Sequence, residues 1–350
     1  RKLERLMKVK ARLRVALERN KVSPPAVEAI IQALGSFALY GFPESHALSF
    51  ALIAYARAWL KVHRSAEFCA GLLNNQPMGF YSRATLVQDA KRHGIRVKPV
   101  CVLVSAATCT VEDDTSVRLG FNQVKGLETT SVETLLRARA ERPFDSAPDF
   151  MRRAPMSANE RRALALVGAL NALPDSSHRR EALWRVEEPV EQGDLFSYAG
   201  ATLVDAELSP LETMTHLERM QADYAGLDLT TGIHPVAALR ASLKDVWRAA
   251  DLREARNGLR VTIAGAVICR QRPGTAKGFV FVSLEDETGI ANAVVRPDLF
   301  EDMRMTVTQE PLLRITGIVQ NVDNVIHVKA EWIEALQADS VPRGVSHDFH

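Results

Sequence analysis

Basic and aromatic residues gather in one short segment near the C-terminal end of the chain. Arg270, Arg272 and Lys277 supply cations, and Phe279 and Phe281 follow directly. Guanidinium and ammonium groups bind phosphates, and aromatic rings stack on unpaired bases. The segment therefore predicts a surface that contacts single-stranded nucleic acid. The alternative is that both phenylalanines pack under a helix or against a neighbouring domain.

Five strand-like runs surround this segment and predict the scaffold that positions it. A helix-length segment, 297–305, separates the third run from the fourth, and this order suits a five-stranded oligonucleotide/oligosaccharide-binding (OB) barrel over residues 258–337. Alternation in the second run places Phe279 and Phe281 opposite an apolar face. The runs are 260–269, 279–284, 290–295, 312–319 and 325–331, with the basic segment as the loop between the first two. In the first run, alternation places Val261, Ile263, Val267 and Cys269 on one face and Arg260, Thr262 and Arg270 on the other.

A second candidate site is the tight turn Lys125-Gly126-Leu127. In a helix-hairpin-helix, such a turn points backbone N–H groups and a helix N-terminus at a DNA phosphate, independently of base sequence. Two capping boxes, Thr130-x-x-Glu133 and Ser157-x-x-Glu160, predict the starts of helices in this region. Ordinary packing of helices around a turn is the alternative interpretation.

The acidic residues and the cysteines predict no metal site and no catalytic group in this chain. Asp113-Asp114 lies in a polar turn without a third placed carboxylate, and residues 285–287 end a strand. The four cysteines, at positions 69, 101, 109 and 269, form no close pair of the kind that binds zinc. We expect reduced thiols, as in a cytosolic protein.

Composition indicates a soluble globular protein with a charge asymmetry. The chain has 350 residues, 47% of them hydrophobic, and a net charge of +2. Residues 1–100 carry 17 Lys/Arg against 6 Asp/Glu, whereas the remaining 250 residues carry 27 against 36. A basic end favours a polyanion as partner, although a solvated helix face is the alternative. We expect no membrane span, because no long apolar run occurs. The start at Arg1, inside a basic helical pattern, leads us to expect the C-terminal piece of a longer chain.

Helical patterns dominate the first third of the chain and predict a multidomain α+β protein. Helices are expected over 1–20, from Pro24 onward, and over 45–60, 65–73 and 81–93, followed by a strand over 97–104. Helical units with a turn fill 106–175, and a connector with one helix over 214–223 fills 176–257. The predicted domains are 1–105 (helical), 106–175 (helix-hairpin-helix), 176–257 (connector), 258–337 (OB barrel) and 338–350 (polar tail).

Several separate blocks of sequence carry a resemblance to one known family. The chain resembles the error-prone branch of the bacterial C-family DNA polymerases, which are related to the DNA polymerase III alpha subunit. These blocks cover nearly the whole chain from about Ile30. They are YGFPESHA at 40–47, LKVH at 60–63, AEF at 66–68, NQPMGFY at 75–81, QRPGTAKG at 271–278, SLEDETG at 283–289 and the ending DFH at 348–350.

The resemblance implies a layout and a set of site residues. Residues 1–105 correspond to the end of the polymerase fingers, where Ser45 and His46 match a serine-histidine-alanine signature near the incoming nucleotide or template; a capped helix with a satisfied histidine is the alternative. The catalytic palm, with aspartates that bind Mg²⁺, is expected upstream, so this chain binds no cofactor itself. In relatives the hairpin usually reads Lys-Gly-apolar-Gly, whereas Glu128 stands at the second glycine here, which puts its phosphate contact in question.

A short segment in the connector resembles the pentapeptide that binds the bacterial sliding clamp. In Gln192-Gly193-Asp194-Leu195-Phe196, the side chains of Leu195 and Phe196 are expected to fill an apolar pocket of the clamp, and Gln192 to fix the register. The alternative is that the Leu-Phe pair packs into its own domain. Family members are also thought to reach the clamp through a partner in a mutagenesis complex.

Three functions follow from these patterns. The first is the C-terminal DNA-binding part of an error-prone polymerase in damage-induced translesion synthesis. It would be inactive alone, act in the bacterial cytoplasm at the nucleoid, and bind primer-template, single-stranded template and mutagenesis-complex accessory proteins. The second is a stand-alone DNA-binding and clamp-tethering module. The third, a carbohydrate-binding barrel, is disfavoured by the basic loop and by the basic first hundred residues.

Overall fold

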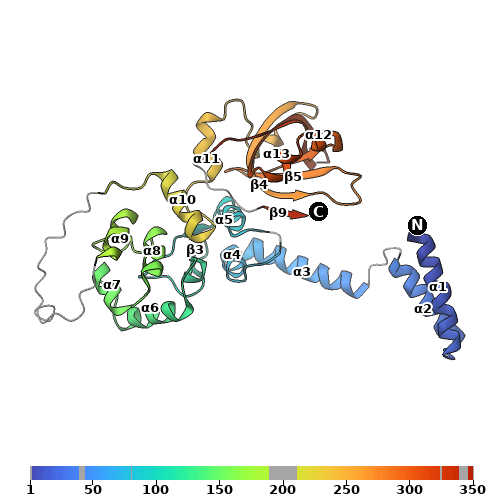
Figure 1. Cartoon of the computed structure of the whole chain (residues 1–350), viewed down its shortest axis with the longest axis horizontal. Helices are drawn as coiled ribbons and strands as arrows, with labels where there is room; N and C mark the ends of the chain where they lie inside the picture. The colour runs from blue at the N-terminus through green and yellow to red at the C-terminus, as the bar shows by residue number, and fades with distance from the viewer. Residues whose placement is uncertain are drawn as a thin grey trace, which may run out of the picture. The chain divides into compact units, whose positions relative to one another are not determined.

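The computed structural model describes residues 2–38, 44–79, 81–188, 211–323, 325–338 and 346–349. The chain divides into two compact units, Arg1–His63 and Arg64–His350. Figure 1 shows the helices and strands of each. Among the described residues, none of the helices is long and apolar enough to cross a membrane. The boundaries of the five sequence-based domains remain predictions.

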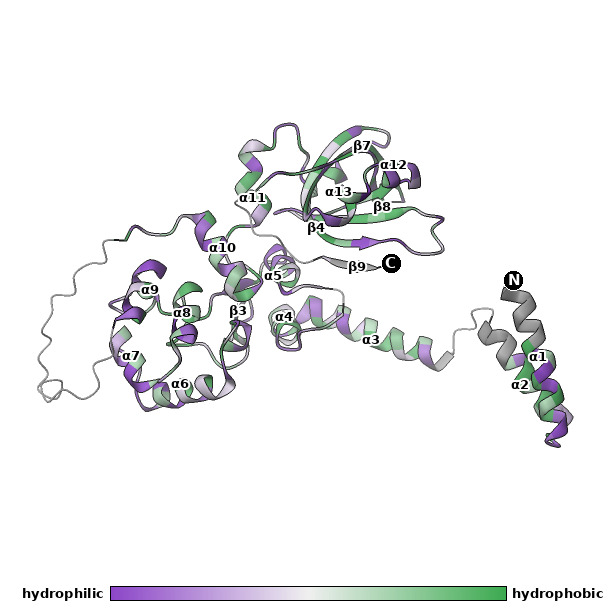
Figure 2. Ribbon diagram, viewed as in Figure 1, coloured by the Kyte–Doolittle hydropathy of each residue, from purple (hydrophilic) through white to green (hydrophobic). Residues whose placement is uncertain are grey.

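The first unit consists of α1 (Lys2–Arg19), α2 (Pro24–Ala38) and α3 (Glu44–His63). Prolines open α2 as predicted, since a first helical turn needs no N–H donors there. An ion pair of 2.6 Å between Arg14 and Glu28 joins α1 to α2. The apolar residues of α3 are exposed, and Figure 2 shows them along the helix.

The second unit begins with a helical part around a small sheet. An apolar core joins α4 and α5 to the later helices. The strand predicted over 97–104 is wrong beyond Lys98, because Val100 is buried in irregular backbone and Val102 in a turn rather than in a ladder. The elements are α4 (Ser65–Asn74), α5 (Arg83–Arg92), β1 (Arg96–Lys98), β2 (Thr110–Asp113), β3 (Ser116–Arg118), η1 (Phe121–Gln123), α6 (Thr129–Glu141), α7 (Ala147–Arg153), α8 (Ala158–Leu166), α9 (Arg179–Glu187) and α10 (His216–Leu227), with sheet order β1-β3-β2.

One of the two predicted capping boxes forms. The Ser157–Glu160 box caps α8, which confirms that prediction. The Thr130–Glu133 box is wrong, because α6 begins at Thr129 behind Glu128, whose side chain makes no capping hydrogen bond. Instead, Glu160 Oε1 accepts the backbone N–H of Glu128 at 3.1 Å. A carboxylate of α8 therefore serves the start of α6 as well.

The C-terminal part is a closed barrel, which confirms the predicted OB fold. Its sheet has the order β5-β6-β8-β7-β4-β9, and an additional pairing between β4 and β5 closes it. Short helices lead into it, and two more bridge β6 and β7. The elements are α11 (Pro235–Leu239), η3 (Arg240–Ser242), η4 (Ala250–Arg253), β4 (Arg260–Gln271), β5 (Val280–Glu285), β6 (Ile290–Val295), α12 (Pro297–Asp302), α13 (Arg304–Gln309), β7 (Leu312–Val322), β8 (Val325–Ala335) and β9 (His347–Phe349).

Alternation in β5 agrees with the prediction, but alternation in β4 does not. Val280, Val282 and Leu284 are buried, and Phe281 on the other face is 39% exposed. In β4 the register shifts between Val267 and Cys269. A bulge of this kind exchanges the faces beyond it. Cys269 is therefore only partly buried, Arg270 becomes buried, and both predicted orientations are wrong.

Two further expectations about the barrel need correction. The strand β4 extends to Gln271, so Arg270 lies in a strand rather than in the loop. The tail expected over 338–350 contains β9, which pairs parallel to the end of β4. A strand of three residues is too short to show periodicity, so β9 could not be identified from the sequence.

Candidate nucleic-acid interface

The loop between β4 and β5 presents most of the predicted cations and rings to solvent. The Arg272 guanidinium carbon lies 4.5 Å from the centre of the Phe300 ring, and its Nη2 lies 3.4 Å from Glu301 Oε1. These contacts hold the base of the loop. Lys277 is exposed, Phe279 is partly buried, and Phe281 is 39% exposed. Accessible cations and a ring thus lie within one loop and its strand, as a nucleic-acid surface requires.

Arg270 does not belong to that exposed set. Its side chain is buried, with 8% of the residue exposed. Its Nε donates to Val307 O at 2.5 Å, Nη2 donates to Glu310 O at 2.5 Å, and Nη1 donates to Ser346 Oγ at 2.6 Å. Asp348 in β9 adds a carboxylate 3.3 Å from Nη1. The guanidinium therefore fastens α13 and β9 to β4, and these bonds occupy the donors a phosphate would need.

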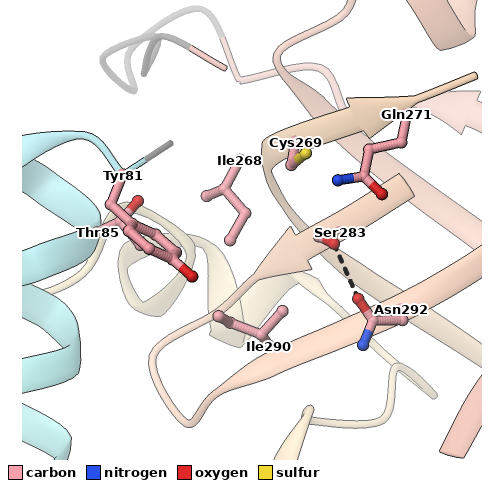
Figure 3. A pocket seen from close by; sticks show the side chains of 8 residues that line it. All are labelled: Tyr81, Thr85, Ile268, Cys269, Gln271, Ser283, Ile290 and Asn292. Carbon is pink, nitrogen blue, oxygen red and sulfur yellow. Dashed lines mark hydrogen bonds between the residues drawn. The ribbon is translucent and has the colours of Figure 1, made fainter. Parts of the chain in front are cut away.

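The outer face of β5 and β6 borders a cavity of about 610 Å³ (Figure 3). Ser283 pairs with Asn292 across the two strands, and Ser283 Oγ donates to Asn292 Oδ1 at 2.8 Å. Tyr81, just before α5, forms part of the opposite wall and is 54% exposed. The full lining comprises Tyr81, Thr85, Ile268, Cys269, Gln271, Ser283, Ile290 and Asn292.

Sequence reasoning missed this cavity for two different reasons. The alternation that places Phe281 outward also places Ser283 outward, and the same rule in β6 identifies Asn292. Those two residues could therefore have been found. Tyr81 has no such signal, because its distance in sequence from the barrel gives no indication that it lies there.

The acidic run that begins with Glu285, the last residue of β5, joins the barrel to the helical part. Arg92 Nη2 in α5 lies 2.9 Å from Glu285 Oε1, and Arg240 Nη2 lies 3.2 Å from Asp286 Oδ2. Asp286 also accepts the backbone N–H of Ala249 at 2.8 Å. These carboxylates are thus engaged by arginines and backbone. Among the described ranges, no group of three or more His, Cys, Asp or Glu is placed to hold a metal ion.

Burial shifts the acid–base properties of this junction. Desolvation raises the pKa of Glu285 to about 7, although the Arg92 guanidinium opposes the shift. Desolvation also lowers the pKa of His234 to about 4. His234 Nδ1 accepts the backbone N–H of Val236 at 3.1 Å and so caps α11. A neutral imidazole is the form that can accept this hydrogen bond.

The predicted hairpin forms between η1 and α6. Gly126 adopts φ of 77°, a left-handed conformation that favours glycine, and a Cβ there would meet nothing within 4 Å. The backbone N–H of Lys125 donates to Gly226 O at 2.8 Å, and Lys125 Nζ lies 2.6 Å from Asp228 Oδ1. Leu127 packs against the core of the helical part. The turn is open to a phosphate, but its lysine is already paired and the side chain of Glu128 is exposed beside it.

Two family models match the two modules. A helix-hairpin-helix motif matches residues 94–182, and an OB-fold nucleic acid binding domain matches residues 261–336. The error-prone DNA polymerase of Bordetella parapertussis is 43% identical over 338 residues, which cover 95% of this chain and 32% of that protein. The error-prone DNA polymerase of Azoarcus sp. is 41% identical over 97% of this chain and 33% of its own length. The chain is a homologue of the error-prone DNA polymerases.

This relationship confirms the resemblance identified from the sequence blocks. The chain spans about a third of the length of these polymerases, and its two modules fit a C-terminal portion of them. Among solved structures, asparaginyl-tRNA synthetase from Pyrococcus horikoshii complexed with asparaginyl-adenylate matches with 24% identity and a TM-score of 0.24. That match covers 30% of this chain and 24% of the synthetase, a likeness too slight to carry an argument.

The remaining predicted residues of the polymerase homologue belong to the first unit or lie outside the described residues. Ser45 and His46 lie in the first turn of α3, and the His46 ring is 4.4 Å from the ring of Phe50. Gln192, Asp194, Leu195 and Phe196 of the clamp-binding segment lie outside the described residues. The roles of all six stay predictions.

Proposed function

We propose that this chain holds DNA for an error-prone DNA polymerase that copies damaged templates in damage-induced mutagenesis. The observation that carries the proposal is the pairing, in one homologue of these polymerases, of a helix-hairpin-helix module with an OB-fold nucleic-acid-binding module. Nucleotidyl transfer, with its Mg²⁺-binding aspartates, is assigned to a palm outside this chain. The protein would act in the bacterial cytoplasm at the nucleoid.

The two modules have complementary chemistry for a primer-template. The hairpin offers backbone groups and the N-terminus of α6 to a duplex phosphate, without reading bases. The barrel offers Arg272 and Lys277 to phosphates and Phe281 to an unpaired base of the template. Ser45 and His46 are proposed to lie near the incoming nucleotide or the template in the complete enzyme.

The decisive experiment measures binding and synthesis on the same DNA. A fluorescent primer-template with a 5′ overhang is titrated with the chain by anisotropy at several salt concentrations, and then incubated with Mg²⁺ and nucleotides. We expect binding whose affinity falls steeply with salt, because each phosphate contact releases counterions. We expect no extension of the primer. Absence of binding at low salt would overturn the DNA-holding role, and template-dependent extension would overturn the assignment of catalysis elsewhere.

Contact with the sliding clamp is a second proposed role, supported by the sequence of residues 192–196. A labelled peptide spanning 188–200 is titrated with clamp beside a control in which Leu195 and Phe196 are changed to alanine. Short clamp motifs depend on their apolar anchors, so the control should lose binding. Equal weak binding by both peptides would remove the role and favour contact through accessory proteins of the mutagenesis complex.

A further inference from the structure

The outer face of β5 is covered at one end and open at the other. Phe281, Ser283 and Glu285 alternate along this face, opposite the core residues. Glu285 is only 3% exposed because Arg92 of the helical part and His234, at the start of α11, lie against it. Phe281 remains 39% exposed. The junction therefore places a wall of the helical part beside the open end of the sheet and leaves a recess between them.

This recess is the cavity of about 610 Å³ described above, and its lining is of mixed chemistry (Figure 3). Tyr81 supplies a flat aromatic ring, and Ile290 supplies an apolar aliphatic side chain. Ser283 uses its proton on Asn292 Oδ1, so the amide nitrogen of Asn292 lies on the side away from Ser283. Gln271 adds a second amide at the rim. Apolar walls with a few amide groups suit a planar ligand that has hydrogen-bonding edges.

We propose that this cavity receives one unpaired nucleobase of a single strand bound to the barrel. Tyr81 provides the surface on which the base stacks, and Asn292, oriented by Ser283, meets its polar edge. The proposal rests on the proposed nucleic-acid binding of the barrel and names the residues that would take a base there. No sequence motif and no matched family model assigns a role to Tyr81, which lies outside both matched ranges.

The surroundings of the cavity favour a nucleic-acid strand over other planar ligands. Phe281 lies two residues before Ser283 on the same face of β5 and offers a platform for a neighbouring base. Arg272 and Lys277 lie in the loop that leads into that strand and can meet the linking phosphates. A free aromatic metabolite or a sugar that occupied the cavity would not contact this series of rings and cations, whereas a nucleic-acid strand would.

The test separates contacts with bases from contacts with phosphates. Binding of a dT12 oligonucleotide is compared with binding of a 12-mer in which every base is replaced by an abasic site, because both carry the same phosphates. The variants are Tyr81→Leu and Asn292→Ala, with Tyr81→Phe as the conservative change. The matched control is Trp332→Leu, since Trp332 is 53% exposed on β8 and does not line the cavity. Circular dichroism checks that each variant is folded.

We expect the wild-type chain to bind dT12 more tightly than the abasic strand. Tyr81→Leu and Asn292→Ala should each weaken dT12 binding, Tyr81→Leu by about tenfold, because loss of one base–aromatic stack has an effect of that size. Neither variant should change abasic binding or the salt slope, and Tyr81→Phe and Trp332→Leu should resemble the wild type. If the chain binds dT12 but Tyr81→Leu binds it equally well, the cavity is not a base site and the proposed function stands. If the chain binds neither strand, both fail.

Discussion

Glu160 shows how one buried side chain can set two helix starts. Its carboxylate accepts the backbone N–H groups of Ser157, at the start of α8, and of Glu128, at the start of α6. Burial by itself would raise the pKa of Glu160, but these bonds and those from the Ser131 and Ser157 hydroxyls lower it to about 2. The carboxylate therefore stays charged in the fold and links the start of α6 to the start of α8.

The change Glu160→Gln should destabilise the second unit by about 1–3 kcal/mol, since an amide can accept only through one oxygen and leaves buried donors unmatched. A native pKa below the unfolded value stabilises the fold above that unfolded pKa, and the benefit disappears as pH falls through about 2. The difference between variant and wild type, measured by urea denaturation, should therefore shrink from pH 6 toward pH 2. A difference that does not depend on pH would contradict this account.

Arg270 and Lys277 are equivalent as sequence letters in a basic segment, but the structure separates them. We expect Arg270→Met to lower the free energy of unfolding by about 3 kcal/mol, because it removes the guanidinium that donates to the carbonyl oxygens of Val307 and Glu310 and pairs with Asp348. Lys277→Met should change stability by less than about 0.5 kcal/mol and instead weaken binding of single-stranded DNA. Denaturation and anisotropy are measured on both variants, so that each serves as the control for the other. If Arg270→Met is folded with unchanged stability but binds DNA more weakly, the assignment of Arg270 to stability rather than to DNA binding is wrong.

At the scale of the elements, the local sequence pattern was sufficient to predict features that depend only on a residue's own strand or helix. The period of two in β5 identified both its core face and the outward ring of Phe281. The prolines of α2 and the box at Ser157 identified helix starts in the same way. The OB topology followed from the order of five such runs.

Features that depend on a distant segment could not be read in this way. The bulge after Val267 exchanges the faces of β4, and it accompanies the pairing with β9 some eighty residues later. Glu285 looks like part of a solvated turn until Arg92 of α5 lies against it. The cavity wall at Tyr81 depends on that same junction. The candidate site was therefore predictable on its barrel side and not on its helical side.

The junction of α5, α11 and β5 should make stability depend on pH in two opposing directions. Glu285 has a native pKa raised to about 7, so its contribution is present below the unfolded value and is lost as pH rises through 7. His234 has a native pKa lowered to about 4, so its contribution is present above the unfolded value and is lost as pH falls through 4. Between these limits the two effects oppose each other.

Each substitution should reveal the effect of the other residue. The variant His234→Asn keeps a side chain able to cap α11. As pH rises from 5 to 7, its stability relative to wild type should decrease by an amount on the order of 1–3 kcal/mol. The stability of Glu285→Gln relative to wild type should instead increase as pH rises over the same range. The charges of Arg92, Arg240 and Asp286, which face the pair, are present in both variants. Denaturation curves measured at steps of half a pH unit test this prediction. Parallel pH profiles of stability for the two variants would show that Glu285 and His234 do not have opposing effects.

At the scale of the whole molecule, the homology and the two modules predict a division of labour on DNA. The hairpin at Lys125-Gly126 has only backbone and one cation to offer, which suits the regular phosphates of a duplex. The barrel has exposed rings as well as cations, and rings gain most from bases that are already unpaired. A primer-template junction presents both kinds of DNA to one chain.

Variants in each module should therefore weaken binding to different DNA. Lys125→Ala should weaken binding to a blunt duplex and spare a single strand, since its exposed pair with Asp228 contributes little to stability. The double change Arg272→Ala and Lys277→Ala should spare the duplex, weaken single-strand binding, and reduce the salt slope on the single strand by about 1.4 if both cations contact phosphate. On a primer-template the two sets of changes should add, because they act on separate contacts. Anisotropy across a salt series with the three DNAs tests this, and equal loss on every DNA from either set would show that the modules share one undivided surface.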